Sequence, residues 1–296
     1  MTISLIAVVG TTASGKSELG IRLAEQLGGE IVSADSRQVY RGLDIGSGKV
    51  TPAERARVPH HLLDVADVRQ RFTVAEYQQL AFAAIEDIWA RGRRPLLVGG
   101  SGLYIRAVVD NPAYPPVPPQ AGLREQLEHT PLPELVRRLE ELDPIGAGRI
   151  DLRNPRRVVR ALEVTLATGQ PFSSQPGTAE PRVEAVQLGL TWPREVLRQR
   201  IDARVDARLP DMVDEVRGLL EQGVPATRLL ELGLEYRYVT QHLLGRLTLA
   251  DAVAGLQQAI YQFARRQLTW FRHDRRIHWL RPERALDDAQ GLLHLG

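Results

Sequence analysis

A phosphate-binding loop stands near the start of the chain. It consists of Gly10, Thr11, Thr12, Ala13, Ser14, Gly15, Lys16 and Ser17. The apolar run 5–9 before it predicts a buried strand, and apolar residues at 19, 23 and 27 after it predict a helix. In this setting the backbone N–H groups, the helix N-terminus and the Lys16 ammonium can bind two linked phosphates, and the Ser17 hydroxyl is a natural Mg²⁺ ligand.

The type of the basic residue in this loop is itself informative. Lys16 and Lys49 are the only lysines in a chain whose other strongly basic side chains are all arginine. A compact ammonium fits inside a tight phosphate loop, where a planar guanidinium does not easily replace it. The lysine at position 16 therefore indicates a role in phosphate binding.

Asp35 is the candidate for proton chemistry, because it follows the second predicted strand, 30–33. It can be a helix N-cap or a water-mediated Mg²⁺ ligand, as in many small kinases, or a general base aimed at an acceptor. Ser36, Arg37 and Gln38 come next and could hold that acceptor or a nucleic-acid base. No aspartate follows the third predicted strand, 95–98, which disfavours an ATP-hydrolysing motor and leaves a small-molecule kinase open.

Composition is that of an ordinary globular protein, with 43% hydrophobic and 25% charged residues. Cysteine is absent, which excludes disulfides, thiolate metal sites and a cysteine nucleophile. The first residues carry no basic n-region, and the apolar run is too short for a signal peptide or a membrane span. We therefore expect a cytoplasmic protein that binds no membrane and acts as a monomer. A pI near 9.1 leaves nucleic acid open as a partner.

The order of predicted elements indicates an α/β fold. Strands alternate with helices over the first hundred residues, which predicts a parallel sheet covered by helices, as in P-loop NTPases, with ligands beyond the strand carboxyl ends. Prolines crowd 112–119, and a second run of breakers covers 170–177. We interpret 113–183 as a small all-helical domain inserted into a core of 1–112 and 184–296. In the second part of that core we predict a strand at 185–190, a helix at 194–209 stopped by Pro210, and a last strand at 276–280.

Several segments, in order along the chain, resemble the tRNA dimethylallyltransferase family, also called tRNA isopentenyltransferases. They are the phosphate loop, 33–46, 59–64, 97–105, 156–163 and 266–272. Ser101 stands where that family usually has threonine, which keeps the hydroxyl. Ile260 and Tyr261 stand where threonine and arginine are common, which weakens the transfer of contacts from the C-terminal helices.

The resemblance implies transfer of a prenyl group from dimethylallyl diphosphate to the exocyclic amine of the adenosine beside a tRNA anticodon. It implies that Asp35 is the general base, and that Lys16 and Ser17 contact the diphosphate and Mg²⁺. It also implies tRNA contacts at Asp35, Ser36, Arg37, Gln38, Ser101, Arg124, Arg156, Arg157, Val158, Val159 and Arg160.

Arginines at helical spacing offer further charges. Arg200 and Arg204 lie four apart on one predicted helix face, and Arg204 is our candidate for the diphosphate, with a solvated face as the alternative. Arg153, Arg156, Arg157 and Arg160 predict a basic side of the inserted helix, for which the alternative is again solvated surface. A second basic stretch, 265–284, could also hold tRNA, but the aromatic residues interleaved with it favour a packed core. We expect structural roles for His60 and His61.

Three functions stay open at this level. The first is an RNA-modifying prenyltransferase, and the second is a kinase acting on a small metabolite with Mg·ATP. The third is a non-catalytic RNA-binding protein. This function does not explain why the chain carries a complete phosphate loop. The arginine-rich inserted helix and the polar run 36–38 favour the first function.

Overall fold

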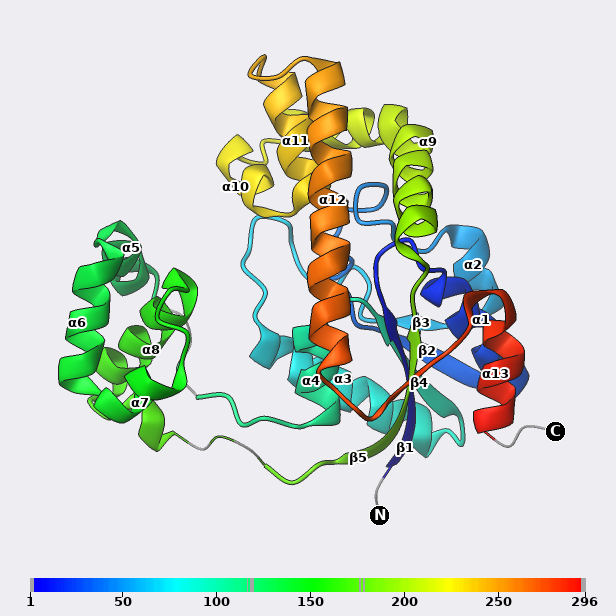
Figure 1. Cartoon of the computed structure of the whole chain (residues 1–296), viewed down its shortest axis with the longest axis horizontal. Coiled ribbons are helices and arrows are strands. Elements are labelled where there is room, and N and C mark those ends of the chain that lie inside the picture. The colour runs from blue at the N-terminus through cyan, green and yellow to red at the C-terminus, as the bar shows by residue number, and fades with distance from the viewer. Residues whose placement is uncertain (1–2, 116, 118–119, 176, 178, 294–296) are drawn as a thin grey trace. The chain divides into compact units, whose positions relative to one another are not determined.

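The computed structural model describes residues 3–115, 117, 120–175, 177 and 179–293, and it divides into two compact units (Figure 1). The first comprises 1–110 and 181–296, and the second comprises 111–180. The domain limits expected from the sequence differ from this division by a few residues at each end. We describe each unit by itself.

The first unit is built on a six-stranded sheet in the order β3-β2-β4-β1-β5-β6, with every neighbouring pair parallel. The strands are β1 (Ile3–Gly10), β2 (Gly29–Ser33), β3 (His60–His61), β4 (Arg94–Gly99), β5 (Val183–Leu190) and β6 (Ile277–Trp279). The prediction of a parallel α/β sheet is thus confirmed. The two-residue β3 is too short to leave a pattern in the sequence, and it was not anticipated.

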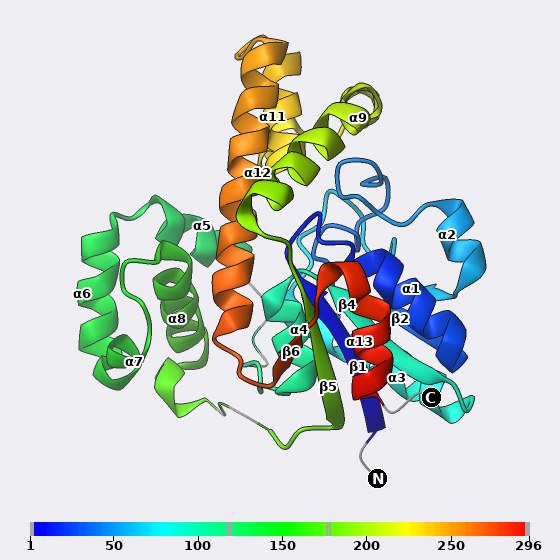
Figure 2. The ribbon, with the colours of Figure 1, turned by 45° about the vertical axis from the view of Figure 1, so that its right-hand side comes forward.

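Helices cover both faces of this sheet. Helices α1 (Lys16–Leu27) and α13 (Ala285–Leu292) share an apolar core with one face, whereas α3 (Val74–Ala90) and α4 (Gly102–Val109) pack together on the other. The remaining helices of this unit are α2 (Pro52–Arg57), α9 (Arg194–Glu221), α10 (Ala226–Glu231), α11 (Leu234–Leu243) and α12 (Leu249–Arg272). Figures 1 and 2 show α9, α11 and much of α12 beyond the edge toward which the strands point.

Helix α9 continues through Pro210, so the predicted end of this helix at Leu209 is wrong. Proline removes one backbone hydrogen bond and costs about 3 kcal/mol in a helix interior. Met212, Val216 and Leu219 follow it on α9 and are buried, which favours keeping this segment helical and packed. Tertiary packing here outweighs the local preference of the proline.

The second unit is helical in all its described elements. These are α5 (Ala121–His129), α6 (Leu132–Leu142), α7 (Pro144–Arg149), α8 (Pro155–Thr168) and a short 3₁₀ turn at Phe172–Ser174. Asn154 caps α8 and Pro155 opens it, as the sequence predicts. Leu135, Leu139 and Leu162 lie at the centre of its own apolar core. This part of the expected fold is confirmed.

Within the described residues, no helix combines the length and the apolar character that a membrane-spanning segment requires.

Replacing Pro210 with alanine should raise stability, because the position is exposed and already helical. We expect a gain of about 1–3 kcal/mol, measured by thermal or denaturant unfolding. Pro52→Ala is the matched control, since Pro52 opens α2 behind the Thr51 cap, where proline is favoured and no such gain arises. An unchanged or lowered stability of the Pro210→Ala variant would contradict this explanation.

Candidate active site

The phosphate loop leaves β1 at a point where two backbones come very close. Gly10 has a φ of 154°, and a Cβ there would overlap the carbonyl oxygen of Leu190 on β5. On the neighbouring strand β4, a Cβ at Gly99 would overlap the carbonyl of Ala34, the residue that follows β2. Only glycine fits at these two positions. The ends of β1, β2 and β4 therefore converge, as the sequence predicted.

Side chains from distant parts of the chain hold the loop in place. On α12, the buried Gln267 accepts from the Thr12 N–H at 2.8 Å and donates to the Gly100 carbonyl at 2.8 Å. Just after β5, the Trp192 indole N–H donates to the Ser14 carbonyl at 3.0 Å. Sequence reasoning missed both roles. A polar Gln267 at the helical spacing of the buried Ala264 and Phe271 is the one signal that could have indicated its role.

Two arginines of α9 also reach the loop. The Arg204 guanidinium donates to the Thr12 hydroxyl at 2.5 Å, and Arg200 Nε donates to the Ala13 carbonyl at 2.8 Å. Burial lowers the pKa of Arg204, partly offset by the charge of Glu235. The structure thus brings both arginines of the predicted pair to the phosphate loop, where Arg204 is half-buried and Arg200 stays exposed.

Lys16 lies at the start of α1 and points back into the loop, where its ammonium donates to the Thr11 carbonyl at 3.3 Å. Burial lowers the pKa of Lys16 to about 8; the Asp35 carboxylate opposes this shift and Arg204 adds to it. Two half-buried cations with lowered pKa values are stabilised by an anion placed between them. The loop is therefore built to receive negative charge.

Asp35 lies half-buried beyond the end of β2, on the same edge of the sheet. One carboxylate oxygen accepts from the Arg37 N–H at 2.9 Å, and the Ser36 N–H donates to the Ser101 hydroxyl at 2.9 Å. Gln38 accepts from the Ser33 hydroxyl at 3.1 Å. The structure thus gathers the acceptor candidates of 35–38 and Ser101 into one group. An N-cap role for Asp35 fails, because no helix begins there.

Glu235, in the first turn of α11, is a carboxylate that the sequence analysis did not single out. Burial raises its pKa, Asp35 adds to this rise, and Arg204 and Arg37 oppose it. These mutual effects place Glu235 in the electrostatic surroundings of both Asp35 and Arg204. No motif in the sequence distinguishes this residue.

In the second unit, Glu163 holds two of the arginines assigned to RNA. Its fully buried carboxylate pairs with Arg124 at 2.5 Å and with Arg160 at 2.7 Å, and it accepts from the Gln120 N–H at 2.9 Å. A buried carboxylate requires such partners, so these two arginines have a structural role.

The side chains of three further residues of this unit do not lie on an exposed basic side of α8. The side chains of Val158 and Val159 are buried in the unit's own core and are not available for RNA contact. Arg153 precedes α8 and bonds Asp151, so it does not belong to the basic side of the helix. Arg156 and Arg157 are exposed on α8 and make no ion pair with any described residue. They remain the candidates for an RNA contact.

Packing accounts for much of the basic stretch 265–284. Phe271 and Ile277 are buried there, and Arg276 pairs with Asp274 and Asp110. The packed core expected from the interleaved aromatic residues is confirmed for Phe271, whereas Trp270 and Trp279 are exposed.

The two neighbouring histidines are held by contacts within the first unit. His60 bonds the Val58 carbonyl through Nδ1, and His61 bonds Glu30 through Nε2. Both bonds agree with the structural roles expected for these residues.

Comparison with known proteins gives consistent results. A family model described as IPP transferase matches residues 38–274. Proteins named tRNA dimethylallyltransferase are 50% identical over 275 residues in Roseiflexus sp. (strain RS-1) and 49% over 279 in Streptomyces coelicolor. These matches cover 91% and 93% of this chain, and 90% and 89% of the relatives.

Solved structures are also similar. A full-length tRNA isopentenylpyrophosphate transferase from Bacillus halodurans gives a TM-score of 0.73 at 36% identity, covering 98% of this chain and 95% of that one. A eukaryotic dimethylallyltransferase acting on tRNA gives 0.79 at 28% identity, covering 98% and 75% respectively.

The lowered pKa of Lys16 gives a pH prediction for this site. The ammonium is protonated below about pH 8 and loses its charge above it, so affinity for an alkyl diphosphate should fall as pH rises through this value. Well above this pH, the affinity should fall about tenfold for each pH unit. Calorimetric titration from neutral to alkaline pH measures it, and Lys16→Ala, which lacks the ionising group, should lose this dependence. An equal alkaline fall in both proteins would assign the effect to another group.

Proposed function

This chain belongs to the tRNA dimethylallyltransferase family, and we propose that it transfers a dimethylallyl group from dimethylallyl diphosphate to the exocyclic amine of the adenosine beside a tRNA anticodon. The observation that carries the proposal is the shared location of the phosphate loop and Asp35 at one edge of the sheet. A site for an anionic leaving group and a proton acceptor are the two requirements of this reaction.

The phosphate loop supports the donor half. In the transfer, the allylic C–O bond breaks and the departing diphosphate gains negative charge. Fixed positive groups aimed at that charge stabilise the transition state in a partly dry site. Lys16, Arg204 and the N-terminus of α1 are such groups, and they are already in place.

Magnesium fits the same location. Mg²⁺ is commonly bound through one or two protein oxygens, substrate phosphates and water, so it needs no protein cage. Ser17, half-buried in the first turn of α1, supplies a hydroxyl beside Lys16. In our proposal this hydroxyl and the diphosphate oxygens hold the ion. When bound, it supplies further neutralisation of the leaving group.

Asp35 supports the acceptor half. As the amine nitrogen bonds to the allylic carbon, it must lose a proton, because the product nitrogen would otherwise keep a positive charge. We assign this proton to the Asp35 carboxylate, which then releases it to solvent. Ser36, Gln38 and Ser101 lie around it and can hydrogen-bond the base that carries the amine. The adenosine has to leave its stack to enter such a site.

In our proposal the second unit contributes tRNA contacts through Arg156 and Arg157. Exposed arginines on a rigid helix can meet successive phosphates or stack on an unpaired base. A tRNA substrate also places the protein in the cytoplasm.

The choice of donor tests the function. We expect wild-type protein, incubated with Mg²⁺ and unmodified tRNA, to move label from the prenyl group of dimethylallyl diphosphate into tRNA. With γ-labelled ATP and the same tRNA or small nucleosides, no label should move. Phosphoryl transfer from ATP without prenyl transfer would make the protein a kinase and contradict the proposal.

Replacement of Asp35 by asparagine tests the base. The variant keeps the size of the side chain and its contact with the Arg37 N–H, but it is not basic. We expect kcat to fall by roughly 10²–10⁴, with tRNA affinity changed much less. Single-turnover rates across a range of pH give the cleanest measurement. A wild-type rate in the Asn variant would mean that another group takes the proton.

Arg156 and Arg157 are tested by the salt dependence of binding. Each Arg→Ala variant should weaken tRNA binding and reduce the log–log salt slope by about one unit, while the KM for dimethylallyl diphosphate stays near wild type. Arg138→Ala, an exposed arginine on α6 of the same unit, is the control. Slopes equal to wild type in both variants would show that this side of α8 is only solvated surface.

A further inference from the structure

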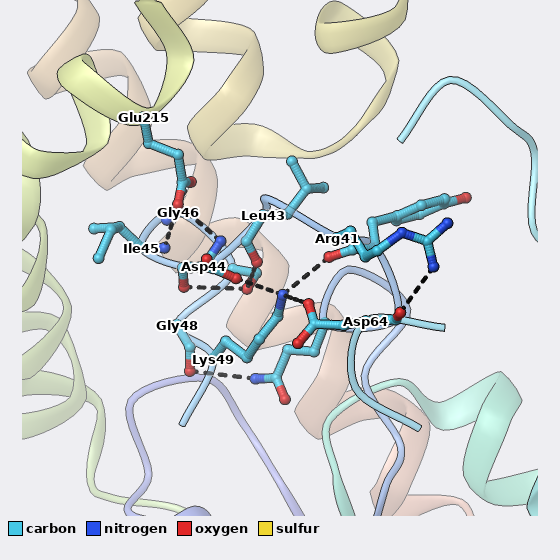
Figure 3. Close-up of polar contacts among 12 residues, drawn as sticks. Arg41, Leu43, Asp44, Ile45, Gly46, Gly48, Lys49, Asp64 and Glu215 are labelled. Carbon is cyan, nitrogen blue, oxygen red and sulfur yellow. Dashed lines mark hydrogen bonds and ion pairs between the residues drawn. The ribbon is translucent and has the colours of Figure 1, made fainter. Parts of the chain in front are cut away.

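Residues 42–48 form a loop without regular secondary structure directly after the acceptor candidates of 35–38. Its sequence, Gly-Leu-Asp-Ile-Gly-Ser-Gly, is rich in glycine. Such a segment loses much conformational entropy when it is ordered, so specific contacts must hold it. Figure 3 shows two sets of polar contacts that do so.

The first set comes from Glu215 on α9. Its Oε2 accepts from the backbone N–H of Asp44 at 2.8 Å and of Ile45 at 2.6 Å, and its Oε1 accepts from the N–H of Gly46 at 3.1 Å. Three consecutive backbone donors thus converge on one carboxylate (Figure 3). Hydrogen bonds to a charged acceptor are about twice as strong as neutral ones.

Tyr236 of α11 completes this arrangement. Its buried hydroxyl donates to Glu215 Oε1 at 2.8 Å and accepts from the Ser47 N–H at 3.1 Å. The carboxylate therefore has four donors, which leaves it little capacity for other ligands. We call Glu215, Tyr236 and the four backbone N–H groups of 44–47 the Glu215 clasp.

The second set ties the same loop to the acceptor candidates. The buried Lys49 ammonium donates to the carboxylates of Asp44 and Asp64, both at 2.5 Å, and to the Tyr40 carbonyl at 2.9 Å. The Gln38 side-chain amide donates to the Gly48 carbonyl at 3.2 Å. The conformation of the loop thus helps to fix where Gln38 points.

Helix α9 also contacts the phosphate loop, through Arg204 and Arg200. Between these arginines and Glu215, the Arg208 guanidinium lies against Gly48, so close that a Cβ there would come within 2.6 Å of it. One helix therefore touches the donor loop at one part of its length and the 42–48 loop at another.

We propose that Glu215 is a positioning residue that couples the donor site to the acceptor site. The clasp holds the 42–48 loop on the helix that carries Arg204, so that a diphosphate bound to Arg204 stabilises the same arrangement of α9 and the loop that orients Gln38. This inference rests on the proposed function. By linkage the coupling is reciprocal, because bound tRNA must favour diphosphate binding by the same factor.

The test is the affinity of tRNA with and without saturating inorganic diphosphate. For wild type we expect diphosphate to tighten tRNA binding by about 5–150-fold. In Glu215→Ala and in Tyr236→Phe this ratio should approach one, and by the same linkage the affinity for diphosphate should no longer rise when tRNA is bound. A merely structural residue would change thermal stability without selectively removing this coupling. Glu221→Gln, an exposed carboxylate at the end of α9, is the control and should keep it.

Tyr236→Phe keeps the ring volume, so it decides the question if the Glu215→Ala variant fails to fold. The proposal would be overturned if a folded clasp variant kept the wild-type ratio of tRNA affinities with and without diphosphate. It would also be overturned if this ratio were one in the wild type. Prenyl transfer by the wild type is measured first. Its absence would overturn the proposed function itself, whereas an active wild type with unchanged coupling in the variants would overturn the clasp alone.

Discussion

The site depends on the close approach of backbones at the carboxyl edge of the parallel sheet. Gly10 lies against the Leu190 carbonyl and Gly99 against the Ala34 carbonyl, at distances that leave no room for a Cβ. These approaches bring the loops after β1, β2 and β4 together. As a result, Lys16, Asp35 and Ser101 occupy one site although they come from three separate segments of the chain. A larger side chain at Gly10 would displace the start of the phosphate loop from β5, and one at Gly99 would separate the loops after β2 and β4.

Charge gives this packed edge its chemical character. Lys16 and Arg204 are held where burial lowers their pKa values, and Glu235 is held where burial raises its own. Burial disfavours the charged form of each group, and a nearby opposite charge offsets this cost. An anionic diphosphate stabilises both cations at once. The same preorganised field that binds the donor can therefore stabilise the charge that develops as it departs.

The sequence predicted the features that are local in the chain. The phosphate loop, the strands beside it, the cap of α8 and the apolar core of the second unit follow from short-range patterns. Contacts between distant segments could not be predicted in this way. Gln267 and Trp192 on the phosphate loop, and Glu215 on the 42–48 loop, are brought to their partners only by the tertiary fold.

Two features of the structure lay beyond local reasoning for the same cause. Pro210 marks a helix end by local rules, but the buried residues that follow it keep α9 continuous. Arg124 and Arg160 are assigned to RNA by resemblance, and their pairing with the buried Glu163 appears only in the structure. A buried glutamate in an amphipathic helix gives no signal of its partners until the fold is known.

The most direct measurement is a crystal structure of the protein with unmodified tRNA, Mg²⁺ and a thio analogue of dimethylallyl diphosphate, in which sulfur replaces the bridging oxygen. The account predicts that the diphosphate contacts Lys16 and Arg204, and that the exocyclic amine of the adenosine lies about 3 Å from the Asp35 carboxylate, within hydrogen-bond reach. A diphosphate bound away from the loop would contradict the account. So would an amine that faces a different proton acceptor.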